Sequence, residues 1–434
     1  MKNLILIQLN EINFDYVHAY CKKYPSKFKN FRKILQLENV KTVSEEKYHL
    51  LEPWIQWVSV YTNKSFKEHN IFRLGDSVSS NNKQIFEEIE SNGYTVGCIS
   101  PMNAANRLKS PKFFVPDPWT KTNPSDDFWS KALHSLIVQT VNENSKSRIT
   151  IKSIFILFLA LIRFAKFKNY ITYLKLALGS RSNPWFKSLF LDLLLSDVHL
   201  GLINKTQPDF TSVFLNAGAH IQHHYFHSSI FSDMNNTNPE WYIKKGKDPI
   251  KDMLEVYDNI LSSYDLLKSY DILTATGLSQ TPFATSKYYW RLNDHKKFLD
   301  LLNIRYRDIQ PRMTRDFLVT FENNEDRDIA VKILGELRLD NTNLFDEIES
   351  RDHSIFATLT YPKIIEPQSI LFFDGKEIDI YKHVVFVAIK NGEHNGEGFA
   401  FLSDKFPENC SKGSFHVSKL YGVIKSFFPT HKKS

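Results

Sequence analysis

Cysteine is scarce in this chain. Its 434 residues include only three cysteines, Cys21, Cys98 and Cys410, which are far apart in the sequence and form no CxxC pair. This usage argues against a disulfide framework and against a zinc site built from cysteines, and it is typical of a reducing compartment. Near the N-terminus, the apolar run from Leu4 to Ile7 is too short for the core of a signal peptide. We therefore expect a cytoplasmic protein.

A strong charge imbalance and long apolar runs are lacking as well. The chain carries 55 basic and 48 acidic residues, a formal net charge of +7, which is too weak to indicate a nucleic-acid-binding face. The wholly apolar run IFILFLALI spans residues 154–162, whereas a membrane-spanning helix needs about 20 apolar residues. The sequence therefore predicts no nucleic-acid partner and no transmembrane span in this run.

The segment after this run combines basic and apolar residues. RFAKFKNYITYLKLALGS, residues 163–180, contains one arginine and three lysines among phenylalanine, tyrosine and leucine. Such a pattern is typical of a basic amphipathic helix, which can lie on an anionic membrane surface or pack against its own domain. Both alternatives stay open, so one expectation is peripheral contact with the inner face of the membrane through residues 151–180.

Apolar and aromatic residues are abundant, at 42% and 14%, which indicates a packed globular protein. Short apolar stretches typical of buried parallel strands alternate with helical patterns. The alternation predicts an α/β fold with a mainly parallel central sheet, helices on both faces, and ligands at the carboxyl ends of the strands. The predicted strands lie in NLILIQLNEIN (3–13), YTVGCIS (94–100), FTSVFLNAG (210–218), YDILTATG (270–277) and HVVFVAIKNG (383–392).

Two regions interrupt this alternation. One is almost entirely helical in pattern, and the other combines strands and a helix with an Asp374-Gly375 pair, which signals a two-residue hairpin. Before the second region, a helix is predicted to begin with Pro249 at its first position. We expect a core in three parts, 1–119, 210–285 and 381–434, with a helical insertion at 120–209 and a small α+β cap at 286–380.

Histidines gather directly after one predicted strand. The stretch NAGAHIQHHYFH contains Asn216 and four histidines, at positions 220, 223, 224 and 227. His220 and His224 are four residues apart, so one helical turn would direct both imidazoles to a common point that suits a divalent metal ion. Histidines also occupy helix faces for structural reasons, so the cluster has both a functional and a structural interpretation.

Two further polar clusters follow predicted strands. His394 lies between glycines in NGEHNGEGF, where the backbone can approach a ligand closely, although an exposed glycine-rich hairpin has the same pattern. Asn10 and Glu11 end the first strand, where a carboxylate can bind a metal ion or cap the following helix. We include Gln280 with Asn10 among the candidate substrate-binding residues.

The stretch LLEPWIQWVSVYTN, residues 50–63, places a glutamate beside two tryptophans. Glu52 would be partly desolvated there, which makes a carboxyl group a better general acid or base. Trp54 and Trp57 are either substrate-binding or core residues. The hydroxyls that follow, at positions 59, 61 and 62, are candidate nucleophiles, but in an apolar segment such groups usually satisfy internal hydrogen bonds.

Taken in order, these clusters resemble the alkaline phosphatase superfamily, particularly its phosphodiesterase, sulfatase and cofactor-independent phosphoglycerate mutase branches. YTN (61–63) and EHNI (68–71) are similar to the Thr-Gly and His-Gly-Ile landmarks of that family. Asn216 and His220 stand where the family has Asp and His four residues apart, and His394 resembles its closing metal histidine. The resemblance covers most of the chain if the two interrupting regions are insertions.

The chain departs from this family at several expected ligands. The family's nucleophile position falls near Pro53, with Glu52 beside it and no Ser, Thr or Cys there. TATG, which includes Ala275 and Thr276, stands in place of Ser-Asp-His-Gly, and Asn216 replaces an aspartate. Fewer carboxylates weaken the binding of a hard divalent ion. The resemblance therefore implies one reduced metal site, or a site without metal in which glutamates and histidines transfer protons.

Three functions fit these features. The first is an enzyme that cleaves or transfers a phosphoester-type or sulfate ester group of a small molecule. The second is a glycan or polyol-phosphate transferase of surface-polysaccharide assembly, with Trp54, Trp57 and Trp290 as candidate pocket residues. The third is an inactive binding protein on the same scaffold. For the enzyme we expect one Zn or Mn ion, or none. Its ligands would be His220, His394 and Asn216, its catalytic residues Glu52, Glu11 and His224, and its substrate-binding residues Trp54, Trp57, Asn10 and Gln280.

Overall fold

The chain folds as two units. The computed structural model describes residues 3–142, 150–232, 236–312, 315–408 and 413–430. One unit comprises Met1–Pro282 with Gly392–Ser434, and the other comprises Phe283–Asn391. Cys21 and Cys98 are buried free thiols, whereas Cys410 lies outside the described residues.

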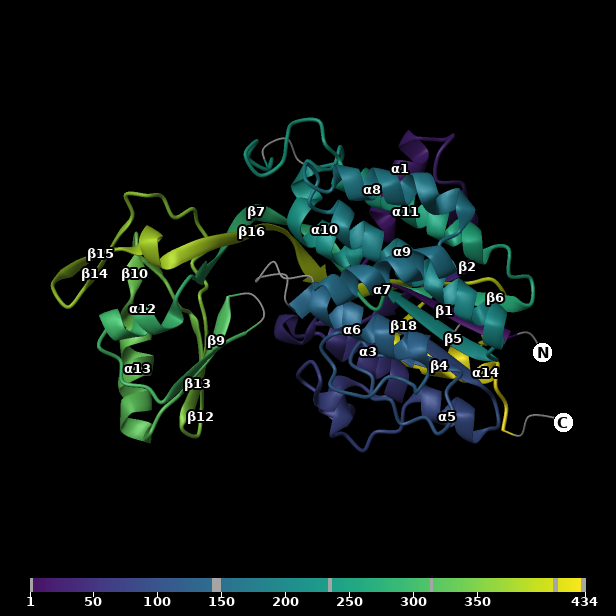
Figure 1. The fold of residues 1–434 in the computed structure, drawn as a ribbon, viewed down its shortest axis with the longest axis horizontal. Helices are drawn as coiled ribbons and strands as arrows, with labels where there is room; N and C mark the ends of the chain where they lie inside the picture. Colours follow the sequence, from purple (N-terminus) through teal and green to yellow (C-terminus); the bar gives the residue numbers. More distant parts are fainter. Residues whose placement is uncertain (1–2, 143–149, 233–235, 313–314, 409–412, 431–434) are drawn as a thin grey trace. The chain divides into compact units, whose positions relative to one another are not determined.

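An eight-stranded sheet forms the centre of the first unit (Figure 1). Most neighbouring strands run parallel, and the predicted α/β fold with a mainly parallel central sheet is confirmed. The strand that runs antiparallel to both of its neighbours is β17. Across the sheet the order is β18 (Ser414–His416), β2 (Glu38–Val43), β17 (Glu397–Leu402), β6 (Tyr270–Ala275), β1 (Asn3–Leu9), β5 (Phe210–Leu215), β3 (Val96–Ile99) and β4 (Phe113–Val115).

Helices cover both faces of this sheet because the strands are apolar on both sides. In β1, Ile5 and Ile7 join one hydrophobic cluster, and Leu4 and Leu6 join the other, as expected for a buried parallel strand. Residues of three helices belong to the second cluster: α3 (Pro53–Thr62), α5 (Ile85–Ser91) and α14 (Leu420–Ser426). The short helix α4 (Phe66–His69) follows α3. Residues of the other helices of this unit belong to the first cluster: α1 (Phe14–Lys23), α2 (Lys29–Leu35), α6 (Phe128–Asn142), α7 (Ile151–Phe164), α8 (Tyr170–Gly179), α9 (Phe186–Thr206), α10 (Ala217–Tyr225) and α11 (Pro249–Tyr264).

Two predictions from the sequence concern helices of the first unit. α11 begins at Pro249, with the side chain of Asp248 accepting a hydrogen bond from the backbone of Lys251, so the predicted helix start is confirmed. The predicted helical region 120–209 contains α6 to α9, which belong to the same compact unit as the central sheet. In the ranges that the structure describes, no helix combines the length and apolar character needed to cross a membrane.

The second unit contains a four-stranded antiparallel sheet and its own core. Trp290 is buried in that core. Asp374 and Gly375 both have left-handed backbone conformations, with φ of 49° and 71°, as a type I′ turn requires, and the predicted hairpin is confirmed. The elements are β8 (Asp308–Pro311), β9 (Asp316–Thr320), β12 (Glu347–Arg351), β13 (Ser354–Thr358), α12 (His295–Leu301), α13 (Asn324–Glu336), and the hairpins β10 (Arg338–Leu339) with β11 (Thr342–Asn343) and β14 (Ile370–Phe373) with β15 (Lys376–Asp379).

One predicted central strand is wrong. The stretch HVVFVAIKNG forms most of β16 (Val384–Asn395), which pairs with β7 (Ser279–Leu292) in a two-stranded ribbon rather than with the central sheet. The strand that enters the central sheet is β17, whose residues from Gly398 to Leu402 are all buried. Both stretches are rich in apolar residues, so local composition does not tell which of them joins the sheet.

The interior position of β17 generates a stability prediction. A Cβ atom at Gly398 would lie 2.5 Å from both Gly277 O and Thr42 Oγ1. We expect Gly398→Ala to lower the free energy of unfolding by about 1–3 kcal/mol, the usual cost of overpacking. Gly422→Ala is the matched control, because its Cβ would meet nothing within 4 Å and alanine favours a helix. Urea denaturation of both variants measures the difference, and equal stabilities would contradict this packing.

Candidate functional site

Segments that are far apart in the sequence meet at one edge of the central sheet. β1 lies between β5 and β6 and is parallel to both, so the residues that follow these three strands share an edge. β17 is antiparallel to β6, so the segment that precedes it reaches the same edge. The topology thus gathers Glu11, Asn216 and His394 where α/β proteins bind ligands.

Glu11, His223 and His394 form a close cluster, here called the acid–histidine group. Glu11 Oε2 is 3.1 Å from His223 Nε2 and 3.2 Å from His394 Nε2, and the two Nε2 atoms are 3.2 Å apart. Among the described residues, these three are the one set of histidine, cysteine or acidic side chains placed closely enough to share a metal ion.

The second nitrogen of each imidazole also has a defined neighbour. His223 Nδ1 is 3.1 Å from the carbonyl oxygen of Gly392, and since a carbonyl only accepts hydrogen bonds, Nδ1 carries the proton. His394 Nδ1 is 3.7 Å from Glu52 Oε2, a carboxylate that favours a proton on that nitrogen. Both Nε2 atoms then direct lone pairs toward Glu11, which is the orientation that outer partners impose on metal-binding histidines.

The carboxylate of Glu11 is fixed by hydrogen bonds to both of its oxygens. Asn10 Nδ2 donates to Oε1 at 3.0 Å, and Gln280 Nε2 donates to Oε2. Trp57 Nε1 in turn donates to Asn10 Oδ1 at 2.9 Å, and Gln222 Nε2 donates to the backbone carbonyl of Glu11 at 2.7 Å. Because Glu11 is only 2% exposed, these partners replace the water that would otherwise solvate it.

The backbone of Glu11 is left-handed, with φ of 61°. This conformation costs a non-glycine residue about 1–2 kcal/mol, which the surrounding hydrogen bonds must offset. Its backbone N–H donates to Thr276 O at 3.0 Å, which ties the turn to the end of β6. Burial raises the pKa of Glu11, but when His394 and His223 are protonated their charges and hydrogen bonds hold that pKa well below its ordinary value.

The helix that carries His223 is held from a neighbouring helix. Asp192 of α9 is buried and accepts hydrogen bonds from the backbone N–H of Ala217 at 2.8 Å and of Asn216 at 3.3 Å. Tyr257 of α11 donates to the same carboxylate at 2.6 Å. A carboxylate is favourable at the N-terminus of α10 because the helix dipole is positive there. Burial nevertheless raises the pKa of Asp192 to about 6.

The histidine pair chosen from helical spacing lies outside the acid–histidine group. The His220 and His224 rings are 4.8 Å apart, but His220 is exposed, and the histidine of α10 that lies close to Glu11 is His223. The sequence pattern includes His223 in the cluster but does not single it out. Spacing within α10 favours partners four residues apart, whereas the second histidine of the group comes from 171 positions further along the chain.

The other candidate residues occupy different environments. Asn216 Oδ1 accepts a hydrogen bond from Asn10 Nδ2 at 2.9 Å, so it is one residue removed from Glu11. Trp57, Asn10 and Gln280 are buried, with exposed fractions of 1% or less. Trp57 holds Asn10, and Asn10 and Gln280 each hold Glu11. Trp54 is half-buried and donates from Nε1 to Phe72 O at 3.0 Å.

The three hydroxyls of α3 are engaged inside the protein. Ser59 Oγ is 3.1 Å from His69 Nε2, and Thr62 Oγ1 donates to Val58 O at 2.8 Å. The hydroxyl of Tyr61 accepts a hydrogen bond from Gln8 Nε2 at 2.6 Å. All three residues are buried, which agrees with the structural interpretation of these groups.

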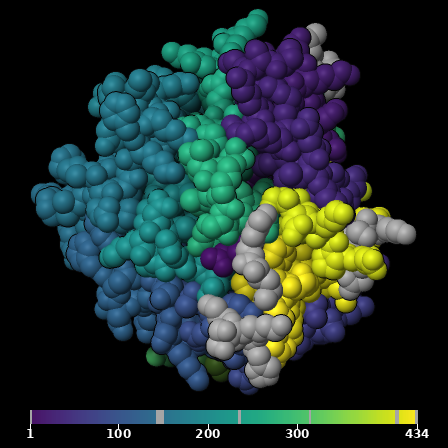
Figure 2. Space-filling model, turned by 90° about the vertical axis from the view of Figure 1, so that its right-hand side faces the viewer, coloured from purple at the N-terminus to yellow at the C-terminus, as the bar shows by residue number. Residues whose placement is uncertain are grey.

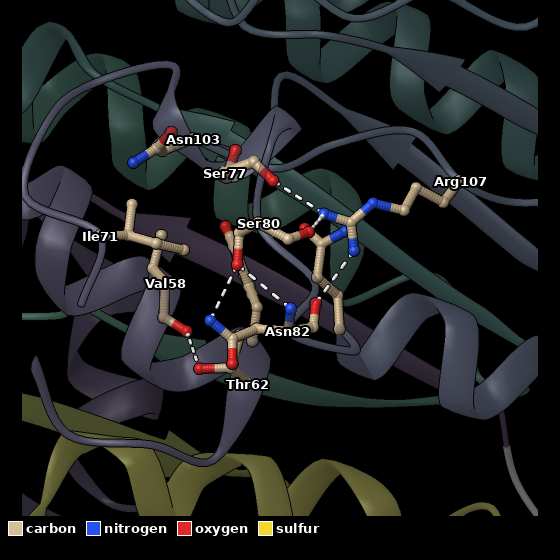
Figure 3. Close-up of a pocket in the computed structure, with 10 residues that line it drawn as sticks. Val58, Thr62, Ile71, Ser77, Ser80, Asn82, Asn103 and Arg107 are labelled. Atoms are coloured by element: carbon tan, nitrogen blue, oxygen red, sulfur yellow. Dashed lines mark hydrogen bonds between the residues drawn. The ribbon is translucent and has the colours of Figure 1, made fainter. Parts of the chain in front are cut away.

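A small cavity borders α3 but includes no member of the acid–histidine group (Figure 3). Val58, Thr62, Asn82 and Arg107 are among its lining residues, and its volume of about 10 Å³ has room for one water molecule. Arg107 donates to the backbone carbonyl of Ser77 at 2.7 Å and thereby closes one side. The cavity is a structural feature, too small for a substrate.

Comparisons with known proteins give structural similarity only. No protein-family model matches the chain, and no curated protein sequence is similar to it. Similar solved structures include murine ectonucleotide pyrophosphatase/phosphodiesterase 5, with 10% identity, TM-score 0.44 and coverage of 100% of this chain and 98% of that chain. Phosphonoacetate hydrolase from Sinorhizobium meliloti has 12% identity, TM-score 0.44 and coverage of 98% and 96%.

The alkaline phosphatase of the Antarctic bacterium TAB5 is also similar, with 8% identity, TM-score 0.43 and coverage of 99% of both chains. At such identities and TM-scores the similarity assigns no activity and no residue role to this chain.

The raised pKa of Asp192 generates a prediction about stability and pH. Between its ordinary value of 3.8 and about 6, the folded protein binds more protons at this group than the unfolded chain does. The contribution of Asp192 to the free energy of unfolding therefore falls as pH rises through this window. We expect the stability of the wild type relative to Asp192→Asn to decrease by roughly 1–3 kcal/mol from pH 4 to pH 6.5. A difference that is constant across this range in denaturant titrations would contradict the assignment.

Proposed function

We propose that Glu11, His223 and His394 hold one divalent metal ion and that the protein uses it to cleave a phosphoester-type bond in a small molecule. The spacing of their donor atoms, 3.1 to 3.2 Å, carries this proposal. Ligands 2.0–2.1 Å from one tetrahedral zinc ion are separated by about 3.3 Å, so the donor set fits such an ion. When both imidazoles are neutral, their two lone pairs and a carboxylate oxygen converge on one point, which is the arrangement that favours a bound cation.

The donor types favour a catalytic ion over a structural one. Two histidines and one glutamate are a ligand set of catalytic zinc sites, which keep a fourth position open, and manganese also accepts carboxylate ligands. When bound, the ion would act as a Lewis acid toward a phosphoryl oxygen. Gly392 O and Glu52 would keep the two imidazoles in the tautomer that this role needs.

The chain supplies the other parts of the proposed reaction. Because the hydroxyls of Ser59 and Thr62 are engaged in the interior, a water molecule from solvent is the proposed nucleophile. Glu52, whose side chain is 30% exposed, is the proposed positioning residue that orients His394 from the solvent side. The phosphoester class rests on the order of the sequence motifs and on the location of the group at the carboxyl ends of the strands.

Metal binding tests the donor set directly. We expect isothermal titration of zinc into the wild type to give one site, and Glu11→Gln, His223→Ala and His394→Ala to weaken it by more than about 100-fold, the upper range for a lost outer-shell partner. His220→Ala is the matched control on the same helix and should bind as the wild type does. Equal losses for His220→Ala and His223→Ala, or no zinc binding by the wild type, would contradict the proposal.

Turnover tests the reaction and the role of Glu52. The zinc-loaded protein should hydrolyse a phosphomonoester or a phosphodiester of p-nitrophenol, and Glu52→Gln should lower kcat by roughly 10–100-fold with a changed pH profile and little change in KM. Glu397→Gln, a surface carboxylate paired with Lys41, is the control. An added alcohol acceptor tests the transferase alternative, because a transferase would form a new ester with the alcohol. A sulfate ester as substrate tests the sulfatase alternative, because a sulfatase would release sulfate. Zinc binding without turnover on any of these substrates would leave a binding protein instead of an enzyme.

A further inference from the structure

α7 and α8 present large apolar side chains to solvent. Their exposed fractions lie between 49% and 88%, which is unusual for so many large apolar residues in adjacent helices. We call this surface the apolar face. It consists of Ile151, Ile154, Phe155, Phe158 and Ile162 in α7, and Phe167, Tyr170, Ile171, Leu174 and Leu178 in and just before α8.

α7 is apolar on the side that faces solvent as well as on the side that faces the protein. Ile156, Ala160 and Phe164 are buried, and Leu157 and Leu161 also pack against the core. A surface helix of a globular protein normally has such an apolar stripe on its inner side only and polar residues on its outer side. The outer side of α7 is therefore suited to an apolar environment that the chain itself does not provide in its described residues.

The two helices belong to one layer of the first unit. Both pack against α9, and Figure 1 shows α7 in front of the central sheet and α8 above it. In Figure 2, which is turned by 90°, the same blue-teal segment occupies the left side of the molecule. The two helices are thus neighbours of the same helix, α9, and each exposes several large apolar side chains.

Positive charge accompanies this surface. Residues 151–191 contain seven basic residues and no aspartate or glutamate, which equals the formal net charge of +7 of the whole chain. Lys168 and Lys175 lie near α11, where Lys168 Nζ donates to Ser262 Oγ at 2.7 Å and Lys175 Nζ is 3.9 Å from Glu255. The seven are Lys152, Arg163, Lys166, Lys168, Lys175, Arg181 and Lys187.

We propose that the apolar face binds the surface of an anionic lipid bilayer, with α7 and α8 lying in the interface. Apolar side chains such as Phe155 and Ile171 would enter the boundary between headgroups and acyl chains, and exposed basic residues such as Lys152 and Arg163 would contact lipid phosphates. A segment without any acidic residue matches a negatively charged surface better than a neutral protein partner. The surface is separate from the acid–histidine group and does not depend on the proposed metal chemistry.

Vesicle co-sedimentation tests this proposal. The full-length protein should sediment with vesicles of phosphatidylcholine and phosphatidylserine, and should stay in the supernatant with phosphatidylcholine alone. Binding should weaken about fivefold for each basic residue removed near the surface, as in Arg163→Gln, and it should decrease with salt. Phe158→Asp should abolish sedimentation because it removes an apolar anchor and adds a charge of the wrong sign.

Two control variants show whether sedimentation depends on the apolar face itself. Phe372→Asp changes a phenylalanine of the second unit that is 68% exposed, compared with 58% for Phe158, and should bind vesicles as the wild type does. Glu11→Gln should also bind normally, so that loss of metal chemistry and loss of membrane binding are distinguishable. Failure to sediment with anionic vesicles would overturn the proposal, as would equal losses in the Phe158 and Phe372 variants. A concentration-dependent dimer that Phe158→Asp disrupts would also overturn it, since a second copy would then cover the face.

Discussion

The mutual approach of one carboxylate oxygen and two imidazole nitrogens is the constraint on which the site depends. Glu11 Oε2, His223 Nε2 and His394 Nε2 all lie within 3.2 Å of one another. The carbonyl of Gly392 accepts a hydrogen bond from Nδ1 of His223, so Nε2 of the neutral imidazole directs its lone pair toward the carboxylate. Three donor atoms at this separation are close enough to share one metal ion, which is the basis of the proposed metal site.

Close backbone packing supports this arrangement. A Cβ atom at Gly392 would lie 2.5 Å from Gln280 Oε1 and 2.7 Å from Gln222 O, so only glycine allows its carbonyl to reach His223. The same two glutamines donate hydrogen bonds to Glu11, one to the side chain and one to the backbone. The left-handed turn at Glu11, the glycine beside α10 and the buried glutamines are thus parts of one tightly packed assembly at the edge of the sheet.

Sequence patterns were informative where a property is local. Apolar runs identified β1, β5 and β6, and therefore the edge of the sheet at which Glu11 and the cluster around Asn216 lie. The turn at Asp374 and the start of α11 followed from the conformational preferences of single residues. These features need only a few neighbouring residues to specify them.

Long-range placement was harder to predict. β16 and β17 have similar apolar composition, and only their pairing partners decide that β17 enters the central sheet. His220 and His223 are both polar positions of one short helix, and the path of the segment around His394 determines which of them meets Glu11. Similarly, the pattern at 151–180 allowed either a packed helix or a membrane-surface helix. Which apolar side chains of α7 and α8 are exposed depends on how these helices pack against α9, and the local sequence does not specify that packing.

Anomalous diffraction at the zinc absorption edge, from crystals of the full-length protein grown with zinc, tests the central claim most directly. The account predicts one strong peak bounded by Glu11 Oε2, His223 Nε2 and His394 Nε2, at about 2.0–2.2 Å from each atom. A peak between His220 and His224, or no peak beside Glu11, would contradict it.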